Sequence, residues 1–248
     1  MLLVWLALIG TTRDAAQAAG LPEVLKDQFG RVVRFDGAAL PQVSGHNMLI
    51  NQTADRAVLH WESFDIAAGN SVRFQQPDST SVALNRVLGQ SNARSVIDGQ
   101  LEANGRVYLI NQNGILFGPS SKVNVHSLIA STLDIDDTVY DQVGLVNAVN
   151  LEQPAFEGRA GAMGDIECAA GCSIESGKNG RVVLIAPKVT NRGSISSPEG
   201  QVVLAGAEDK VYIAAEQEGS EVRGLLVEVS TGGSVHNLGR LVADRGNV

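Results

Sequence analysis

The chain has few aromatic residues and no cluster of basic ones, and both shortages restrict what it can be. Aromatic side chains make up 4% of the 248 residues, against 44% hydrophobic residues in all, so we expect an aliphatic core. Sugar binding by aromatic stacking is disfavoured for the same reason. The formal net charge is −8 and Lys and Arg are dispersed. Because nucleic-acid phosphates are bound by concentrated positive charge, we expect no nucleic-acid partner.

Long hydrophobic runs and long helical patterns are also missing. The apolar run at residues 2–9 is too short to cross a bilayer. Small residues follow it, and they offer an Ala-x-Ala cleavage site after Ala18. We interpret residues 1–19 as a signal peptide, or as the back part of a longer one, since the usual basic start is absent. A buried N-terminal segment or a misassigned start is the alternative.

Cysteine is scarce, and the two that occur, Cys168 and Cys172, lie close together. In an exported chain such a pair can close a small disulfide, because Gly171 lets the loop bend and the compartment is oxidising. A metal site would need about four ligands, and no histidine is near. A redox Cys-x-x-Cys motif is absent. We therefore predict a disulfide between Cys168 and Cys172 that pins one turn.

Catalytic signatures are missing as well. The chain has no Gly-rich phosphate loop, no His-Glu-x-x-His and no Gly-x-Ser-x-Gly motif. Its four histidines are scattered singly, so we interpret them as surface or turn residues: His46, His60, His126 and His236. The acidic group at residues 134–137 supplies only part of a calcium loop. We expect no metal, no cofactor and no enzymatic activity.

What the chain does contain is a repeated short strand. The segment Asn104-Gly105-Arg106-Val107-Tyr108-Leu109-Ile110 returns as Asn179-Gly180-Arg181-Val182-Val183-Leu184-Ile185, and a similar strand follows with Gly200 placed 20 positions after Gly180. Around residues 104–132, short alternating strands are separated by Asn/Gly and Pro/Ser turns that cannot hold a helix. A similar strand at roughly 20-residue spacing indicates a solenoid.

The repeat favours a parallel β-helix over an antiparallel sandwich or barrel. One coil cannot bury its own apolar face, whereas stacked coils share a core and satisfy each other's backbone groups. Buried parallel strands also tolerate continuous apolar runs such as residues 182–186. The sandwich remains the alternative, although two-residue Asn-Gly hairpins are few.

The repeat also divides the chain. Residues 20–50 lack it, and we interpret them as an N-terminal cap over the first coil. Regular strands begin at Ala57, and the first three are expected at residues 57–61, 71–74 and 82–87. Between Asp134 and Glu175 the repeat fades, so we predict a protruding loop or short hairpin there, with coils resuming at Gly180. Residues 232–248 read as a coil in progress without a polar terminal repeat, so we expect residues 20–248 to be the front domain of a longer protein.

Three motifs, in this order, carry a family resemblance: residues 55–66, residues 81–87, and Asn111-Gln112-Asn113-Gly114-Ile115-Leu116-Phe117-Gly118. Together they resemble the N-terminal secretion domain of filamentous-haemagglutinin-like exoproteins, closely over about residues 25 to 150 and more loosely beyond. The family's Asn-Pro-Asn-Gly-Ile motif has Gln112 here at the proline position. Likewise Gln75 stands where the family often has Asn.

The resemblance implies a right-handed parallel β-helix that directs a large adhesin-type or haemagglutinin-type exoprotein, through the periplasm, to a dedicated outer-membrane pore in two-partner secretion. The partner would be the periplasmic domains of that pore, and the product would be secreted or remain at the cell surface. The implied site residues are Asn85, Asn111, Asn113, Gly114 and Ile115, either shaping a turn or contacting the pore. Asn suits such turns because its short amide bonds local backbone, and Gly permits positive φ.

Two other function classes stay open. A surface adhesin would bind host-cell receptors or glycans with its own coils. A β-helical polysaccharide-degrading enzyme would need carboxylates in register with Arg181 and Arg192, and no such set is found in the sequence. In the secretion-domain interpretation the chain is a monomer that nucleates β-helix folding outside the cell.

Overall fold

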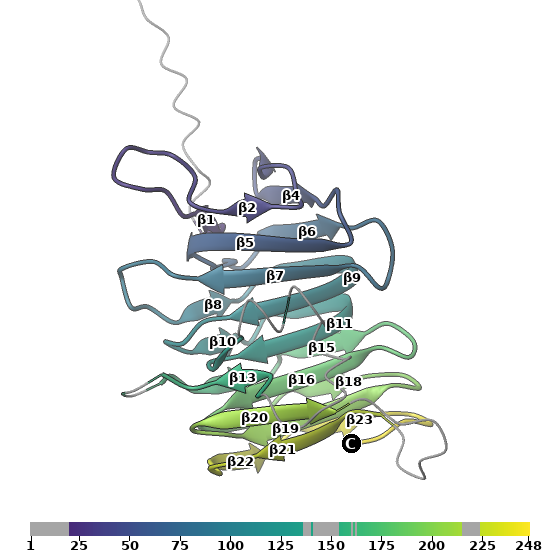
Figure 1. Ribbon diagram of the computed structural model, residues 1–248. Coiled ribbons are helices and arrows are strands. Elements are labelled where there is room, and N and C mark those ends of the chain that lie inside the picture. Colours follow the sequence, from purple (N-terminus) through teal and green to yellow (C-terminus); the bar gives the residue numbers. More distant parts are fainter. Residues whose placement is uncertain (1–19, 136–139, 141–153, 160, 162, 215–223) are drawn as a thin grey trace, which may run out of the picture.

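The computed structural model describes residues 20–135, 140, 154–159, 161, 163–214 and 224–248, and the chain there is all-β with parallel sheets. It winds in successive coils, which are stacked along the length of the molecule (Figure 1). Face one contains β5 (Arg56–Ser63), β7 (Val82–Val87), the second half of β9 (Gln100–Ile110), the second half of β11 (Lys122–Ser131), β16 (Arg181–Ala186) and β19 (Gln201–Gly206).

Two further faces complete each coil. Face two contains β4 (Asn47–Asn51), β6 (Ser71–Gln75), the first halves of β9 and β11, β15 (Ser173–Ser176), β18 (Ser194–Ser196) and β23 (Arg240–Val242). Face three contains β8 (Ser95–Ile97), β10 (Ile115–Phe117), β14 (Ile166–Cys168), β17 (Lys188–Asn191) and β22 (Ser234–Asn237). Neighbours within each face pair in parallel, so the predicted all-β fold with parallel sheets is confirmed and the antiparallel sandwich is excluded.

The register of face one explains the sequence repeat. Its inward-facing column runs through Ala57, Ala83, Val107, Leu128, Val182 and Val202. The steps are 26 residues (57 to 83), 24 (83 to 107), 21 (107 to 128), 54 (128 to 182) and 20 (182 to 202). Val107 and Val182 flank Leu128 on its two sides, so the similar segments that carry them are two coils apart. The predicted 20-residue coil after Gly180 is confirmed.

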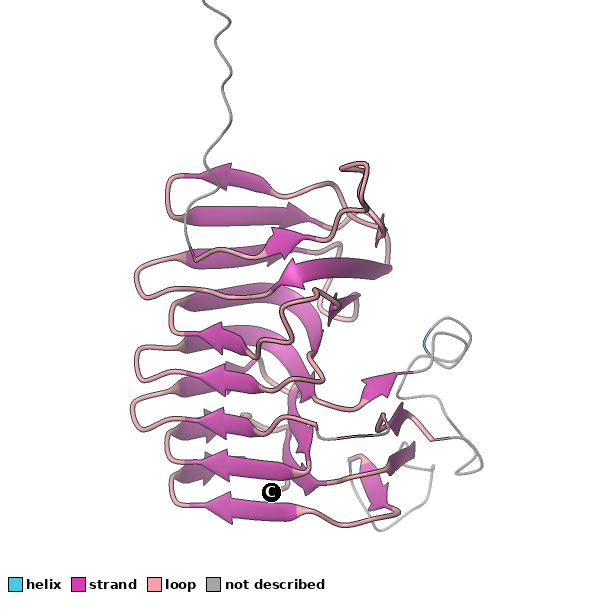
Figure 2. Cartoon of the chain, turned by 90° about the vertical axis from the view of Figure 1, so that its left-hand side faces the viewer, coloured by secondary structure: helices cyan, strands magenta, loops and turns pink. Residues whose placement is uncertain are grey.

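The long step marks where the chain leaves the stack. β12 (Asp134–Ile135) and β13 (Phe156–Glu157) branch off after β11, while β20 (Lys210–Ala214) and β21 (Leu226–Val229) branch off after β19. The four strands join in the order β12-β13-β20-β21 as a separate antiparallel sheet, called here the side sheet. Figure 2 shows it beside the stacked strands.

Face one is apolar on both sides because it has two neighbours. Its inward side chains, among them Trp61 and Val182, join the core inside the coils. Its outward side chains, such as Tyr108 and Ile185, pack with the side sheet in a second buried cluster. The continuous apolar runs follow from this double burial.

The first coil has its edge covered by local strands. β1 (Glu23–Val24) and β2 (Phe35–Asp36) pair antiparallel with β5, and β3 (Gln42–Ser44) pairs antiparallel with β4. Parallel stacking starts at β4, which pairs with β6. The segment interpreted as the cap, residues 20 to about 50, therefore overlaps the stack at its C-terminal end, since β4 begins at Asn47.

The predicted interruption is also too long. β14 and all but the last residue of β15 lie inside the stretch from Asp134 to Glu175, yet both strands are in register with the stack, so coils resume at Ile166 and not at Gly180. The sequence hid them because Ile166–Cys168 is short and lacks the Gly-Arg-Val signature of face one. Asp136 and Asp137 of the acidic group, and residues 1–19 of the predicted signal peptide, lie outside the described residues.

Within the described residues, no cluster of three or more metal-ligating side chains is found. The same residues contain no helix that is long and apolar enough to cross a membrane.

Candidate recognition turn

The turn at residues 111–114 links face one to face three, and Asn111 is its buried anchor. The side chain is 0% exposed. Its Nδ2 donates to the Ala93 carbonyl oxygen at 3.1 Å and to Ser95 Oγ at 3.0 Å. Its Oδ1 accepts from the Asn113 backbone N–H at 2.9 Å. These bonds join two coils and close the turn, so Asn111 holds the fold locally.

Gly114 and Ile115 complete the turn. Gly114 has φ +115°, a conformation that disfavours residues with a Cβ. Its N–H donates to the Asn111 carbonyl at 3.0 Å. Ile115 is 1% exposed and sits in the core column between Ser95 and Ile166. Both residues shape the turn and neither offers a side chain to solvent.

Asn113 and Gln112 differ, because both are partly exposed. Asn113 Oδ1 accepts from Arg159 Nη2 at 3.0 Å, and the Gln112 carbonyl accepts from the Gly164 N–H at 2.9 Å. A Cβ on Gly164 would lie 2.2 Å from the Asn113 carbonyl carbon, so the chain returning from the side sheet packs directly on this turn. Sequence reasoning missed Arg159 and Gly164, whose one signal was their place in the faded part of the repeat.

Asn85 belongs to strand β7 and not to this turn, and it points inward. It occupies the core column between Leu59 and Leu109 and is 0% exposed. Its Oδ1 accepts from Trp61 Nε1 at 2.9 Å, while its Nδ2 donates to the carbonyls of Ala83 (3.1 Å) and Tyr108 (3.2 Å). The structure therefore does not bring Asn85 together with the turn at residues 111–114.

Buried polar groups fix the side sheet to face one, and the sequence did not single them out. Arg86 is 6% exposed; its Nε donates to Asp134 Oδ1 at 3.0 Å and its guanidinium also donates to the Ile135 carbonyl. Tyr140 is 1% exposed and its hydroxyl donates to the Ala57 carbonyl at 3.1 Å. An arginine inside a strand motif gave no signal of an ion pair with a residue 48 positions away.

Cys168 and Cys172 are joined in a disulfide, with Cα atoms 5.6 Å apart. The bond spans the corner between faces three and two. Gly193 of the next coil lies against it, since a Cβ there would come within 2.7 Å of Cys168 Sγ.

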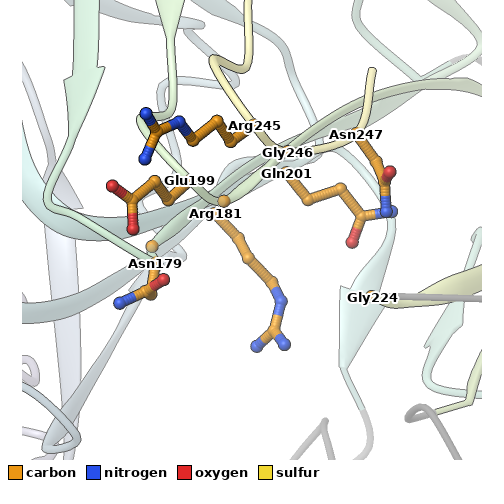
Figure 3. Close-up of a pocket in the computed structure, with 10 residues that line it drawn as sticks. Asn179, Arg181, Glu199, Gln201, Gly224, Arg245, Gly246 and Asn247 are labelled. Carbon is orange, nitrogen blue, oxygen red and sulfur yellow. The ribbon is translucent and has the colours of Figure 1, made fainter.

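A polar pocket of about 260 Å³ lies where face two turns into face one (Figure 3). Three stacked turns form it, and in each a left-handed residue precedes a glycine: Asn179 (φ 58°), Glu199 (φ 53°) and Arg245 (φ 59°). The tight glycines explain the shape, because a Cβ on Gly200 would lie 2.0 Å from the Gly180 carbonyl oxygen. The pocket is a product of coil stacking.

The arrangement does not support a catalytic centre. Arg181 lines the pocket, whereas Arg192 follows β17 on face three and pairs with Glu167 at 3.4 Å. Glu199, the one carboxylate among the described residues that line the pocket, pairs with Lys178 at 3.0 Å. The two arginines considered for an enzyme therefore lie on different faces and share no carboxylate set among the described residues.

Charge on face one affects one histidine. Burial lowers the pKa of His126, and the positive charges of Arg106 and Arg181 lower it further. His126 lies on the same corner as the pocket glycines, since a Cβ on Gly180 would lie 1.9 Å from its carbonyl oxygen. His46 instead bonds Asn70 through Nδ1 at 2.9 Å.

A stack of parallel coils with a side sheet, turned at an Asn-x-Asn-Gly-Ile motif and lacking a catalytic constellation in its described part, defines a class of secretion domain. The TPS secretion domain family matches residues 36–248, and the chain belongs to that family. Such a domain is a non-enzymatic targeting domain that mediates secretion of a two-partner secretion exoprotein, and exoproteins of this type are secreted across the outer membrane.

Particular relatives are found in Haemophilus influenzae. The chain is 38% identical over 133 residues to a heme/hemopexin-binding protein, covering 53% of this chain and 14% of that protein. It is 36% identical over 173 residues to the heme/hemopexin-binding protein of strain Rd, covering 68% of this chain and 18% of that protein. The HMW1 secretion domain structure matches with TM-score 0.67 and 31% identity, over 85% of this chain and 52% of that one. The chain thus spans less than a fifth of the curated relatives' length.

Proposed function

We propose that this chain addresses a longer exoprotein to an outer-membrane transporter and then templates its folding outside the cell. Its finer architecture in this proposal is a right-handed parallel β-helix formed by residues 20–248, with an N-terminal cap made by β1, β2 and β3 and the side sheet as the extra-helical element. The observation that carries the proposal is the continuous register of the stack, in which the strands of each face pair with those of the adjacent coils. Such a stack can grow one coil at a time as chain emerges.

The last described coil has apolar side chains at its outer edge. Val189 is 0% exposed, whereas Val235, which pairs with it in the next coil, is 42% exposed. Leu241 is likewise more exposed than its partner Ile195, which is 0% exposed. A further coil placed there would bury these side chains and extend both hydrogen-bond ladders.

We assign different roles to the motif residues. Four of these residues act through folding, because their side chains or backbone groups are buried and bonded inside the structure: Asn111, Gly114, Ile115 and Asn85. Asn113 is the one of the five site residues that the periplasmic domains of the transporter can contact, because it is partly exposed and its amide oxygen accepts from the exposed Arg159 among the described residues.

The test is secretion of the chain, tagged after Val248, from cells with and without the transporter. We expect transporter-dependent release into the medium. Asn111→Ala should reduce both stability and release, because about three hydrogen bonds of a buried amide are lost. Asn113→Ala should leave stability almost unchanged and reduce release. Release of Asn113→Ala at the level of the unchanged chain would remove Asn113 from recognition, and no release of any chain would overturn the secretion role.

A second candidate function follows from the relatives' names. We propose that parts of the exoprotein outside this chain bind haem or hemopexin, or a host receptor or glycan. We also propose that this chain by itself is a monomer. Two of the histidines are engaged structurally, His46 with Asn70 and His126 against Gly177. Titrating purified chain with haemin should leave the haemin absorbance spectrum unchanged. A saturable spectral shift would place ligand binding in this domain.

A further inference from the structure

The disulfide closes a ring of unusual composition at one corner of the stack. The two cysteines are four positions apart, and the three residues between them, Ala169, Ala170 and Gly171, are the smallest available. These three residues are partly or fully exposed, while both cysteines are buried. The bond therefore links residues of a single corner and joins no two coils.

The folded corner has noncovalent counterparts. The Cys172 N–H donates to the Ala169 carbonyl at 3.0 Å, and two corners of earlier coils close in the same way: Asn70 N–H to the Ala67 carbonyl at 3.0 Å and Ser121 N–H to the Gly118 carbonyl at 3.1 Å. Those corners hold without a disulfide. The corner geometry thus does not require the covalent bond. The disulfide acts mainly by restricting the conformations of the chain before the corner has packed.

The burial of the two cysteines indicates when their disulfide forms. Cys168 is 0% and Cys172 2% exposed once the coils have stacked, and Gly193 of the next coil lies against the sulfur. A protein oxidant must form a mixed disulfide with one of the thiols, so it needs access before stacking. The proposed function puts stacking after transport, and on that premise the oxidising step comes earlier.

We propose that the Cys168–Cys172 disulfide is closed in the periplasm before transport and that the chain crosses the outer membrane with the ring intact. The two thiols lose two electrons and two protons to a dithiol-disulfide oxidant of the cell envelope, which is reduced to its dithiol. The ring then arrives outside as a preformed corner at the point where the stack restarts after the side-sheet strands β12 and β13. This inference rests on the proposed secretion role.

The ring is narrow enough for this. Five extended residues span about 14 Å between their end Cα atoms, and the disulfide holds those ends at 5.6 Å. The chain loses little length, and its local width is two strands carrying methyl groups and hydrogens. A bridge between coils is different: Leu116 and Glu167 are paired neighbours on face three, and linking them would close a loop of 52 residues (116 to 167).

The experiment compares three tagged chains: the unchanged chain, Cys168→Ser with Cys172→Ser, and that serine variant carrying Leu116→Cys and Glu167→Cys. Periplasmic protein from transporter-free cells is acid-quenched and reacted with a polymer-linked maleimide. Each free thiol then slows the migration of the tagged chain on a denaturing gel. Medium from transporter-containing cells is assayed for each chain, with and without a reductant in the culture. Circular dichroism of the purified inter-coil variant checks that it folds.

We expect the unchanged chain in the periplasm to carry no free thiol and to reach the medium as abundantly as the serine variant. The inter-coil variant should be retained severalfold more, and the reductant should restore its release. Free thiols in the periplasmic unchanged chain, or its retention relative to the serine variant, would overturn the inference. Release equal for all three chains without reductant would overturn the argument from ring size. If the serine variant is not released despite an active transporter, the secretion role itself fails.

Discussion

The buried amide of Asn85 makes a sharp test of how the core is held, because it is a polar residue in an otherwise apolar column. Leu59 and Leu109 pair with it in the neighbouring coils, so Asn85→Leu restores the column's usual residue type. The change removes the acceptor for Trp61 Nε1, which lies 2.9 Å from Oδ1. Trp61 is 0% exposed and packs edge-on against Phe35 and Phe64, so water cannot replace the lost partner.

The magnitude follows from counting what is left unsatisfied. An orphaned buried N–H costs about 1–3 kcal/mol, and burying extra apolar surface at the leucine offsets part of this cost. We expect Asn85→Leu to lower the free energy of unfolding by about 2 kcal/mol. Trp61→Phe leaves Oδ1 unpaired and a smaller ring in the core, and it should cost about 3 kcal/mol. With both changes neither partner remains, so the double variant should cost about 1–2 kcal/mol less than the two single costs together.

Urea denaturation followed by far-ultraviolet circular dichroism measures these values without relying on Trp61 fluorescence. The four chains of the cycle are compared at one temperature and pH, and each slope is checked for a common denatured state. Costs that add to within about 0.5 kcal/mol would refute the claim that the hydrogen bond couples these two coils.

Three further outcomes are expected. Gly200→Ala should destabilise the chain by about 3 kcal/mol or more in the same assay, because a Cβ would meet a carbonyl oxygen of the preceding coil at 2.0 Å. The control Gly45→Ala, at φ +59° with open space around it, should cost about 1 kcal/mol. Equal costs for the two variants would contradict the stacking geometry. The pKa of His126 is lowered in the folded chain. The unfolding free energy should therefore be highest at a pH above the pKa of the unfolded chain's histidine, about 6.5, and should fall as the pH drops toward the folded pKa. A His126→Gln chain whose unfolding free energy changes with pH by the same slope would contradict this. Replacing Cys168 and Cys172 by serine should lower the unfolding free energy by about 2 kcal/mol, the chain-entropy value for a five-residue ring. The matched comparison is the unchanged chain after reduction, whose thermal or urea midpoint should equal that of the serine variant.

Much of the coil pattern could be predicted because it depends on local sequence. The strands expected at residues 57–61, 71–74 and 82–87 coincide with β5, β6 and β7. The 20-residue step to Val202 was visible because paired columns repeat the same residue types. Short turns with Asn and Gly marked the corners, since those residues tolerate the backbone there. Local preference and repetition were thus enough for the all-β, parallel fold.

The candidate site was less predictable. The sequence could place Asn111 and Asn113 in one motif, but their exposure could not be assigned: Asn111 is buried while Asn113, two positions later, is partly exposed. For Asn85 the deciding fact is the parity of its position on β7, which places it inward beside Trp61. Parity depends on how many residues each corner uses, and corner length is set by the coils above and below.

By itself, the sequence determined the repeated strand, the turn chemistry, the absence of basic and aromatic clusters, and the family resemblance. All of these are properties of neighbouring residues. The tertiary structure alone decided that two interruptions of the repeat, near residues 134–157 and 210–229, meet in one side sheet and cover face one. It also decided that Arg86 is held by Asp134 across 48 positions. Pairings of this kind close long loops and leave no periodic trace, because they depend on where the stack has already placed its faces.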